Sequence, residues 1–455
     1  MNNDVSCAAQ QELTEFMEQG YGLAILIGRK GVGKTHALHT SSNSKCFYFC
    51  SQDKENAQAM KTRLANEWGQ FSGDKQLSFR ASHYLSWFDI LQEFETWAQE
   101  KELCLVFDDA HWLTGPRTGF LDEFVNFWKS WKENRNIKIV LATSSSRFLD
   151  RQIMSEGGDF SKYLRIDMKP LQMRQVSQRF FPNWSAREVG LAYLMTGGIP
   201  SYLKKMNSKE TFVAAVQDMF FSENWIEDEV QKILTLHFSK RGVASVLKIL
   251  KTMPPEGVLQ SKITEYSKVP QSSVSEILTR LVDFGLIYRR LPYSKEARRN
   301  DVGYLYFLND RFLCFWFQVL EEHFSGNEQS RDSFANMLLS ESGTLHDYYE
   351  KALELLVQEV FEGRVEASPE FYRATNSEKV MGLSDQISSV RPVESHWGDV
   401  EDFKWSTRTK ESPAGKTLVL SKPWTPSFAL KAKDEGVHLV SFEQLIGEVS
   451  EHYQA

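Results

Sequence analysis

The residues with the clearest chemical capacity form a glycine-rich loop near the start of the chain. Residues 28–35 read GRKGVGKT, which fits the phosphate-binding pattern G-x-x-x-x-G-K-[ST] and directly follows the apolar run Leu23–Ile27. Glycines let backbone N–H groups close around phosphate oxygens, and the loop delivers those oxygens to the positive end of the next helix. The pattern therefore predicts a nucleoside triphosphate as ligand. A glycine-rich strand-to-helix turn without a ligand is the alternative, and the agreement of motif, strand and helix disfavours it.

Each residue type in this loop has its own predicted role. Lys34 would lie on the β- and γ-phosphates, and Thr35 would give its hydroxyl to Mg²⁺, because this hard cation prefers oxygen ligands. ATP and Mg²⁺ are accordingly the predicted cofactors. The remaining predicted nucleotide contacts come from the loop and the first turn of the helix: Gly28, Gly31, Val32, Gly33 and His36.

A pair of aspartates supplies the second chemical signal. The apolar run Leu103–Phe107 ends in Asp108 and Asp109, so a buried strand would deliver two carboxylates. After a phosphate-binding loop, the first aspartate would hold the Mg²⁺ shell and the second would orient or deprotonate the attacking water. A solvated acidic turn is the alternative. The pair therefore favours a hydrolase over a scaffold that only binds nucleotide.

Composition places the chain among ordinary globular proteins. It has 455 residues, of which 42% are hydrophobic and 25% charged, and a soft prior of about 150 residues per domain suggests about three domains. Because the first residues show no signal peptide and no apolar run reaches the ~18 residues of a membrane helix, we expect a cytoplasmic protein without membrane contact. We interpret the five cysteines as reduced structural thiols: Cys7, Cys46, Cys50, Cys104 and Cys314.

The charge is unevenly distributed. The net charge is −7, yet residues 230–300 contain thirteen Lys/Arg against five Asp/Glu, a local +8 that leaves −15 for the rest of the chain. A basic segment in an acidic protein is a candidate electrostatic footprint. It makes double-stranded DNA a candidate partner through residues 230–300. The sequence leaves open whether the protein forms an oligomer.

Alternating strand-like and helical stretches between Tyr21 and Leu171 predict a parallel sheet covered on both faces. Four tryptophans are expected to pack in helix faces: Trp87, Trp97, Trp128 and Trp131. Residues from Val176 to Glu229 are expected to be helical, interrupted by the turn at Thr196–Pro200. The predicted strands are Leu23–Ile27, Cys46–Cys50, a weaker Leu77–Ala81, Leu103–Phe107 and Ile137–Thr143.

The basic segment has the element order of a winged helix. Helical periods at Val243–Leu250 and Ile263–Tyr266 precede a third helix at Gln271–Phe284, and strands at Leu286–Arg290 and Val302–Leu308 enclose a basic loop. Such a module suits DNA, whereas a packing module or autoinhibitory latch is the alternative. The third helix would present Gln271, Ser272, Ser275, Thr279 and Arg280, and the wing would carry Lys295, Arg298 and Arg299.

Together these motifs resemble the archaeal-type ATPase family of signal-transduction P-loop ATPases, which is related to the AAA+ group. The resemblance implies that Thr143 or Ser144 senses the γ-phosphate, that Arg147 is an arginine sensor and that Pro200 lies near the adenine. The matching segments are GRKGVGKT at Gly28, FDDAHWL at Phe107, IVLATSSSR at Ile139, GGIP at Gly197 and FLNDRFLCFWF at Phe307.

Members of that family with this layout often end in a domain resembling PD-(D/E)xK nucleases. Here a helix at Leu345–Glu362, strands at Thr417–Leu420 and Val437–Phe442, and a helix at Pro426–Asp434 fit that order. Nuclease chemistry needs paired carboxylates on Mg²⁺ and a lysine. A degenerate structural copy is the alternative. The candidate nuclease residues are Glu350, Asp385, Asp402 and Lys404.

The resulting hypothesis is an α/β protein with a P-loop ATPase domain at 1–171, a helical lid at 172–229, a winged helix at 230–320 and a nuclease-like α/β domain at 321–455. Its predicted function is an ATP-binding and ATP-hydrolysing switch that binds DNA. Two alternatives stay open. One is a DNA-binding regulator that holds ATP with little turnover, and the other is a defence or mobile-element effector with a Mg²⁺-dependent nuclease.

Overall fold

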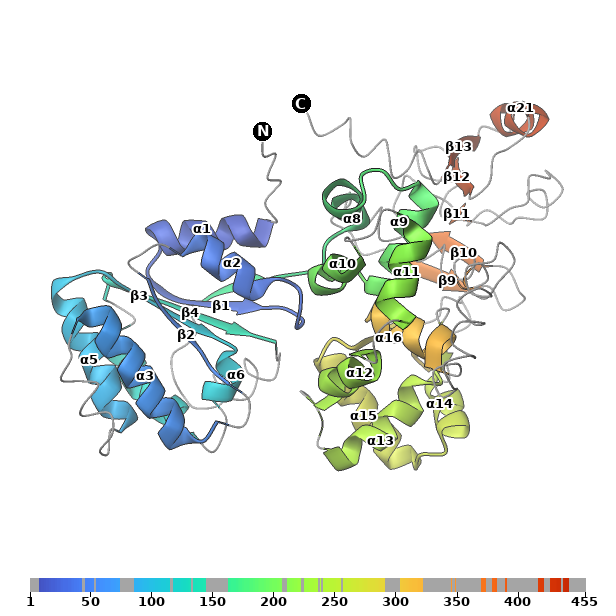
Figure 1. Ribbon diagram of the computed structural model, residues 1–455. Helices are drawn as coiled ribbons and strands as arrows, with labels where there is room; N and C mark the ends of the chain where they lie inside the picture. Colours follow the sequence, from blue (N-terminus) through green and yellow to red (C-terminus); the bar gives the residue numbers. More distant parts are fainter. Residues whose placement is uncertain are drawn as a thin grey trace. The chain divides into compact units, whose positions relative to one another are not determined.

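The chain divides into two compact units, Met1–Pro170 and Leu171–Ala455. Both units are drawn in Figure 1. The computed structural model describes residues 8–42, 46–52, 55–73, 86–114, 118–131, 134–144, 163–206, 211–221, 225–235, 238, 240–254, 257–290, 303–321, 345, 348, 370–373, 379–382, 389–390, 416–420, 426–434 and 437–441.

The first unit is built on a five-stranded sheet in the order β2-β3-β4-β1-β5, and all its strand pairs are parallel. Four predicted strands are confirmed to within a residue. The fifth described strand, β5, lies at an edge and was missed, because only Ile166 in it is fully buried and the run carries two charges. The predicted run Leu77–Ala81 lies outside the described residues. The strands are β1 Gly22–Ile27, β2 Cys46–Cys50, β3 Leu103–Asp108, β4 Ile137–Thr143 and β5 Tyr163–Asp167.

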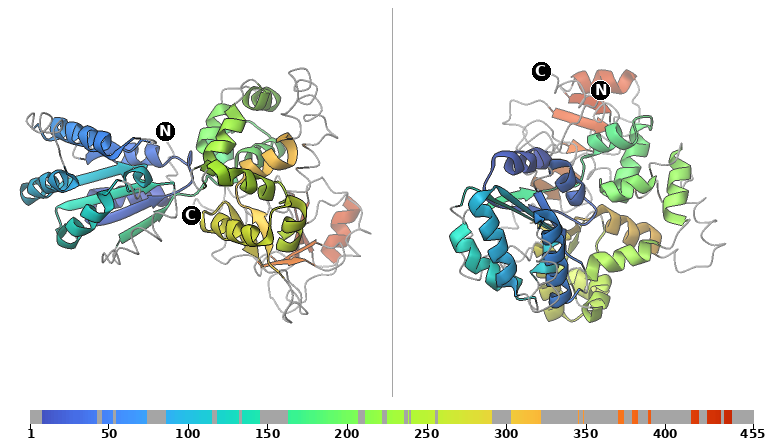
Figure 2. Two further views of the ribbon diagram at one scale, coloured as in Figure 1. Left: turned by 90° about the horizontal axis from the view of Figure 1, so that it is seen from below. Right: turned by 60° about the vertical axis from the view of Figure 1, so that its left-hand side comes forward.

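Helices cover both faces of this sheet, as predicted (Figures 1 and 2). Alternate strand residues such as Leu105 and Phe107 pack with α3, α5 and α7, whereas their neighbours, such as Val106, pack with α1 and α2. Three of the four tryptophans expected in helix faces are buried in the first of these cores, and Trp97 packs against it. The helices are α1 Ala8–Gln19, α2 Lys34–Ser41, α3 Ala57–Ser72, α5 Trp87–Glu100, α6 Ala110–Leu113 and α7 Phe120–Trp131.

Helices open the second unit, and the predicted turn at Thr196–Pro200 interrupts them. Helix α9 ends at Thr196 and α10 begins at Pro200. Between them Gly197 and Gly198 have φ of 63° and 68°, and a Cβ at Gly198 would lie 2.1 Å from the Leu171 carbonyl oxygen. Only glycine fits there. The helices are α8 Met173–Phe180, α9 Ala186–Thr196, α10 Pro200–Met206, α11 Phe212–Phe221 and α12 Trp225–Thr235.

Three further helices and a small antiparallel sheet follow in the basic segment. The sheet has the order β6-β8-β7, and the three predicted helices and two predicted strands are present with shifts at their ends. One hydrophobic core joins this part to α8–α12. The elements are α13 Lys240–Leu250, β6 Val258–Leu259, α14 Gln260–Ser267, α15 Gln271–Asp283, β7 Ile287–Arg290, β8 Leu305–Leu308, α16 Arg311–Phe315 and the π-helix η2 Trp316–Leu320.

The tail is described only in short segments. Strands β9 and β10 pair antiparallel, whereas β11, β12 and β13 form a parallel sheet in that order. The β12–α21–β13 order matches the predicted strand, helix and strand. No described helix has the length and apolar composition required to cross a membrane. The elements are β9 Glu370–Arg373, β10 Lys379–Gly382, β11 Ser389–Val390, β12 Lys416–Leu420, α21 Pro426–Asp434 and β13 Val437–Ser441.

Candidate nucleotide-binding site

The glycine-rich loop connects β1 to α2 and has the backbone that phosphate binding requires. Gly31 and Gly33 have φ of 84° and 105°, values that side-chain-bearing residues rarely adopt. Gly28 donates its N–H to the Thr143 carbonyl at 3.2 Å, and a Cβ at Gly28 would lie 2.5 Å from the Met168 carbonyl oxygen. The loop is therefore packed against β4 and the end of β5. Glycine is required at Gly28 by this close packing, and at Gly31 and Gly33 by their positive φ.

Lys34 is buried in this loop and donates to three oxygens. Its Nζ lies 2.7 Å from the Gly28 carbonyl, 3.1 Å from the Arg29 carbonyl and 2.9 Å from Ser144 Oγ. An ammonium has three protons, so all its donors are used by the loop and by the end of β4. Burial lowers the pKa of Lys34 to about 8, although Asp109 and Asp108 act in the opposite direction. A phosphate group would replace carbonyl dipoles with full negative charge.

Asp108 lies at the carboxyl end of β3 and is only 1% exposed. Its Oδ2 accepts hydrogen bonds from Thr35 Oγ1 at 2.6 Å and from the Tyr48 hydroxyl at 2.8 Å. Its Oδ1 accepts the backbone N–H of Asp109 at 2.9 Å. The predicted Mg²⁺ residues, Thr35 and Asp108, are therefore in direct contact, and their hydroxyl and carboxylate oxygens are the donors that fit Mg²⁺.

Asp109 follows in a left-handed conformation, with φ 49° and ψ 38°. Aspartate tolerates this region better than most residues, and the sharp turn ends β3 and begins α6 at once. The Asp109 side chain makes no capping hydrogen bond to α6, so its carboxylate is not consumed by the helix. Burial raises the pKa of Asp109, and the charge of Asp108 raises it further, while Lys34 opposes both. A partly buried carboxylate with a raised pKa suits a general base.

The two residues predicted to sense the γ-phosphate, Thr143 and Ser144, lie at the end of β4 and have different contacts. Thr143 is fully buried, and its Oγ1 lies 3.5 Å from Nδ1 of His111 on α6. Ser144, one residue later, is the one whose hydroxyl contacts Lys34. Of the two residues, the described contacts favour Ser144. The contact between Thr143 and His111 was not predicted, because 32 residues separate them in sequence.

The remaining predicted contacts have different surroundings. Val32 is 3% exposed, so its side chain belongs to the core and only its backbone is available to a phosphate. His36 is exposed in the first turn of α2. Pro200 is the first residue of α10 in the second unit, and its place near the adenine stays a prediction. Arg147 and the four candidate nuclease residues, Glu350, Asp385, Asp402 and Lys404, lie outside the described residues.

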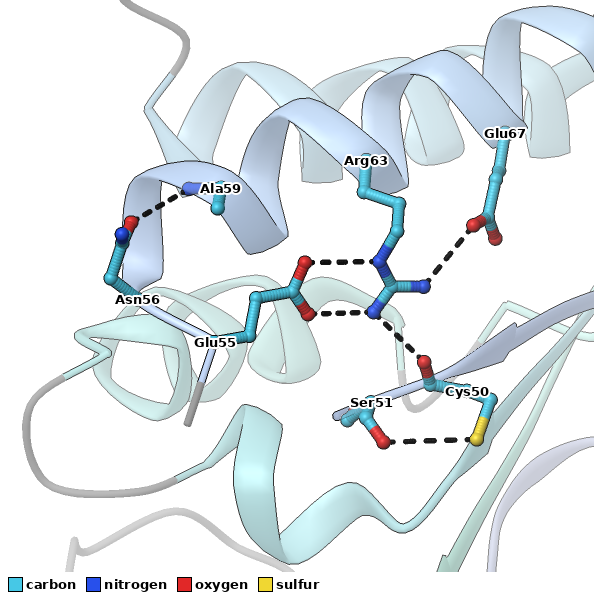
Figure 3. Close-up of polar contacts among 7 residues, drawn as sticks. All are labelled: Cys50, Ser51, Glu55, Asn56, Ala59, Arg63 and Glu67. Carbon is cyan, nitrogen blue, oxygen red and sulfur yellow. Dashed lines mark hydrogen bonds and ion pairs between the residues drawn. The ribbon is translucent and has the colours of Figure 1, made fainter. Parts of the chain in front are cut away.

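Arg63 of α3 anchors the end of β2 beside the site (Figure 3). Its guanidinium donates to Glu55 and Glu67 at 2.7–3.1 Å, and to the Cys50 carbonyl at 2.9 Å. The next residue, Ser51, donates its N–H to the Asp108 carbonyl at 3.0 Å. The ion pairs thus hold the backbone that flanks the aspartate pair, a role with no local sequence signal.

The basic segment differs from expectation at Arg280. This side chain is only partly exposed: its guanidinium lies over the Phe238 ring at 4.5 Å, and its Nη1 lies 3.9 Å from Glu276 Oε1. The other four residues expected on the outer face of α15 are exposed: Gln271, Ser272, Ser275 and Thr279. The expected wing residues Lys295, Arg298 and Arg299 lie outside the described residues. Arg280 is therefore only partly exposed, with a side-chain exposure of 27%, and its guanidinium is shared with an aromatic ring.

The sequence of the first unit is similar to a known domain family. An AAA domain family model matches residues 17–151. Residues 17–151 are therefore similar to an AAA domain, and the parallel five-stranded sheet with its glycine-rich loop is consistent with a P-loop NTPase fold. The Walker-type ATPase PABY2304 of Pyrococcus abyssi superimposes with a TM-score of 0.51 at 18% identity, covering 68% of this chain and 95% of that one.

Two other solved structures align less closely. The ORC2 protein of Aeropyrum pernix has a TM-score of 0.44 at 12% identity, covering 72% of this chain and 92% of that one. A STAND protein with a tetratricopeptide repeat sensor, PH0952 from Pyrococcus horikoshii, has a TM-score of 0.35 at 17% identity, covering 80% of this chain and 50% of that one. No curated protein sequence matches the chain.

Proposed function

We propose that the protein binds ATP with Mg²⁺ and hydrolyses it. The observation that carries this proposal is the meeting of three strand ends at one loop. The loop follows β1, its Lys34 contacts Ser144 just after β4, and Thr35 contacts Asp108 at the end of β3. Ligands of parallel α/β sheets bind at the carboxyl ends of the strands. A strand-to-helix turn that binds no ligand would not require a buried lysine whose three protons are all donated to two loop carbonyls and one hydroxyl.

The chain's own residues have separable roles in this proposal. Lys34 exchanges the Gly28 and Arg29 carbonyls for phosphate oxygens, and Ser144 reports on the γ-phosphate through Lys34. Asp109 orients the attacking water and takes its proton at a carboxylate oxygen. Thr35 and Asp108 would hold Mg²⁺, which neutralises charge on the β- and γ-phosphates when bound.

The first test is nucleotide binding and turnover. Lys34→Ala should weaken or abolish ATP binding in a folded protein, measured by calorimetry in the presence of Mg²⁺. Lys129→Ala, at an exposed lysine of α7, is the matched control and should bind like wild type. Wild-type affinity in Lys34→Ala would refute the proposal. Phosphate release by wild type then separates hydrolysis from binding alone.

DNA binding by the basic segment is the second part of the proposal. Three helices with a three-stranded antiparallel sheet, α13–α15 and β6-β8-β7, have the element order of a winged helix. The exposed cations here include Lys262, Lys268 and Arg289, and Arg289 lies over the Tyr304 ring at 4.5 Å. Fluorescence anisotropy with double-stranded DNA at low salt tests this part. If wild-type protein binds no DNA, the proposal for this segment changes to the autoinhibitory latch, in which its basic residues contact the acidic remainder of the chain.

Coupling between these activities is the third part. An ATPase domain (1–171), helical lid (172–229) and winged helix (230–320) would make the protein a switch in which nucleotide state controls DNA contact. Slow turnover with DNA affinity that responds to ATP would favour the regulator instead. The interpretation of residues 321–455 as a nuclease-like domain is supported only by the order of β12, α21 and β13 among the described elements. We retain it as the effector alternative, with Mg²⁺-dependent cleavage of plasmid DNA as its test.

A further inference from the structure

Tyr48 reaches the candidate Mg²⁺ site from a strand that carries no recognised motif. It lies on β2, which pairs in parallel with β3 so that Tyr48 is opposite Val106 and Cys50 is opposite Asp108. Its hydroxyl donates to Asp108 Oδ2 at 2.8 Å, across 60 residues of sequence. Strand β2 thus contributes a hydrogen-bond donor to a carboxylate that is carried by β3.

The hydrogen bonds on Asp108 define what this carboxylate can still accept. An ionised carboxylate has about four lone-pair positions, two on each oxygen. Thr35 and Tyr48 occupy both positions on Oδ2, and the Asp109 N–H occupies one on Oδ1. No further donor to Asp108 is present among the residues that the structure describes, so one position remains on Oδ1. Because Mg²⁺ keeps most of its water molecules, a Mg²⁺-bound water is a suitable donor for that position.

Tyr48 is itself fixed by the helix that follows the glycine-rich loop. The His39 ring of α2 lies 4.4 Å from the Tyr48 ring, centroid to centroid. A tyrosine phenol is protonated at neutral pH, and here its hydroxyl donates to Asp108. The Tyr48 side chain on β2 thus links helix α2 to strand β3.

We infer that Tyr48 is a positioning residue for Mg²⁺: its hydroxyl fills Oδ2 of Asp108 together with Thr35, and so directs the free Oδ1 position to a Mg²⁺-bound water. The inference rests on the proposed function, since it requires a Mg²⁺–nucleotide complex. It adds Tyr48 to the residues of that proposal. Loss of an outer-shell partner of a metal ligand typically weakens metal affinity about 10- to 100-fold.

The experiment is a Mg²⁺ titration of Tyr48→Phe with mant-AMPPNP as the fluorescent nucleotide. The variant keeps the ring that packs against His39 and removes only the hydroxyl. We expect the Mg²⁺ concentration at half-maximal binding to rise about tenfold, with nucleotide affinity in EDTA unchanged. Tyr21→Phe, at a tyrosine that is 52% exposed in the same unit, is the matched control and should titrate like wild type.

Asp108→Asn completes a double-mutant cycle. If Tyr48 acts through Asp108, Tyr48→Phe should add little to the Mg²⁺ requirement in the Asp108→Asn background. A Tyr48→Phe titration that coincides with wild type would overturn the inference, as would a loss of nucleotide affinity that is equal with Mg²⁺ and with EDTA. Wild-type protein that binds no nucleotide with Mg²⁺ would instead overturn the proposed function, and the inference with it.

Discussion

Replacing Lys34 should change how the stability of the nucleotide-free protein depends on pH. Burial lowers its pKa from 10.5 to about 8, and each pKa unit corresponds to about 1.4 kcal/mol. Between these two values the unfolded chain holds a proton that the folded protein has lost, so the free energy of unfolding rises with pH. The folded protein should therefore gain about 3 kcal/mol between pH 7.5 and 10.5 from this side chain. Lys34→Met, which is similar in size and uncharged, removes that gain.

The measurement is urea unfolding at a series of pH values, with EDTA and without nucleotide. The informative quantity is the difference between wild type and Lys34→Met, because all other groups titrate in both proteins. We expect that difference to change by about 3 kcal/mol over the window, in favour of wild type at high pH. Lys129→Met controls for the loss of an exposed lysine. Parallel pH curves for wild type and Lys34→Met would refute the assignment of a desolvated ammonium in the loop.

Four further outcomes follow from the same structure. ATP affinity should be highest below pH 8 and fall as pH rises through it, because phosphate restores the charge of Lys34 and binding takes up a proton; a calorimetric titration series that is flat to pH 10 would contradict this. Asp109→Asn should keep ATP binding and lose phosphate release, whereas unchanged kcat would place the base elsewhere. Reversing Arg298 and Arg299 should reduce the salt slope of DNA binding by about 0.9 per lost phosphate contact, and Arg280→Lys should leave that slope unchanged. If the tail is a nuclease, Mg²⁺-dependent plasmid cleavage should vanish in Lys404→Ala and persist in Lys34→Ala; loss in both would tie cleavage to ATP binding.

Local patterns in the sequence were enough to place four of the five described strands of the first unit. Strands buried on both faces have near-continuous apolar runs. β1 and β3 have such runs and β4 has one interrupted by Lys138, so their positions were predicted to within a residue. Edge strand β5 has no such signal, because only one of its residues is fully buried. The glycine-rich loop and the aspartate pair were equally accessible, since each is a short motif attached to a recognisable strand.

What the sequence by itself determined is therefore the set of reactive residues within each motif and the strand or helix that carries each one. The tertiary structure decided their partners. Ser144 meets Lys34 across 110 residues and Tyr48 meets Asp108 across 60, because the sheet order places β4 beside β1 and β2 beside β3. Arg280 is a second example: its helical spacing predicted an outward cation, and only the tertiary structure shows that its guanidinium packs over the Phe238 ring and leaves it partly exposed. Strand order and cross-element packing arise from the whole core, so no local period encodes them.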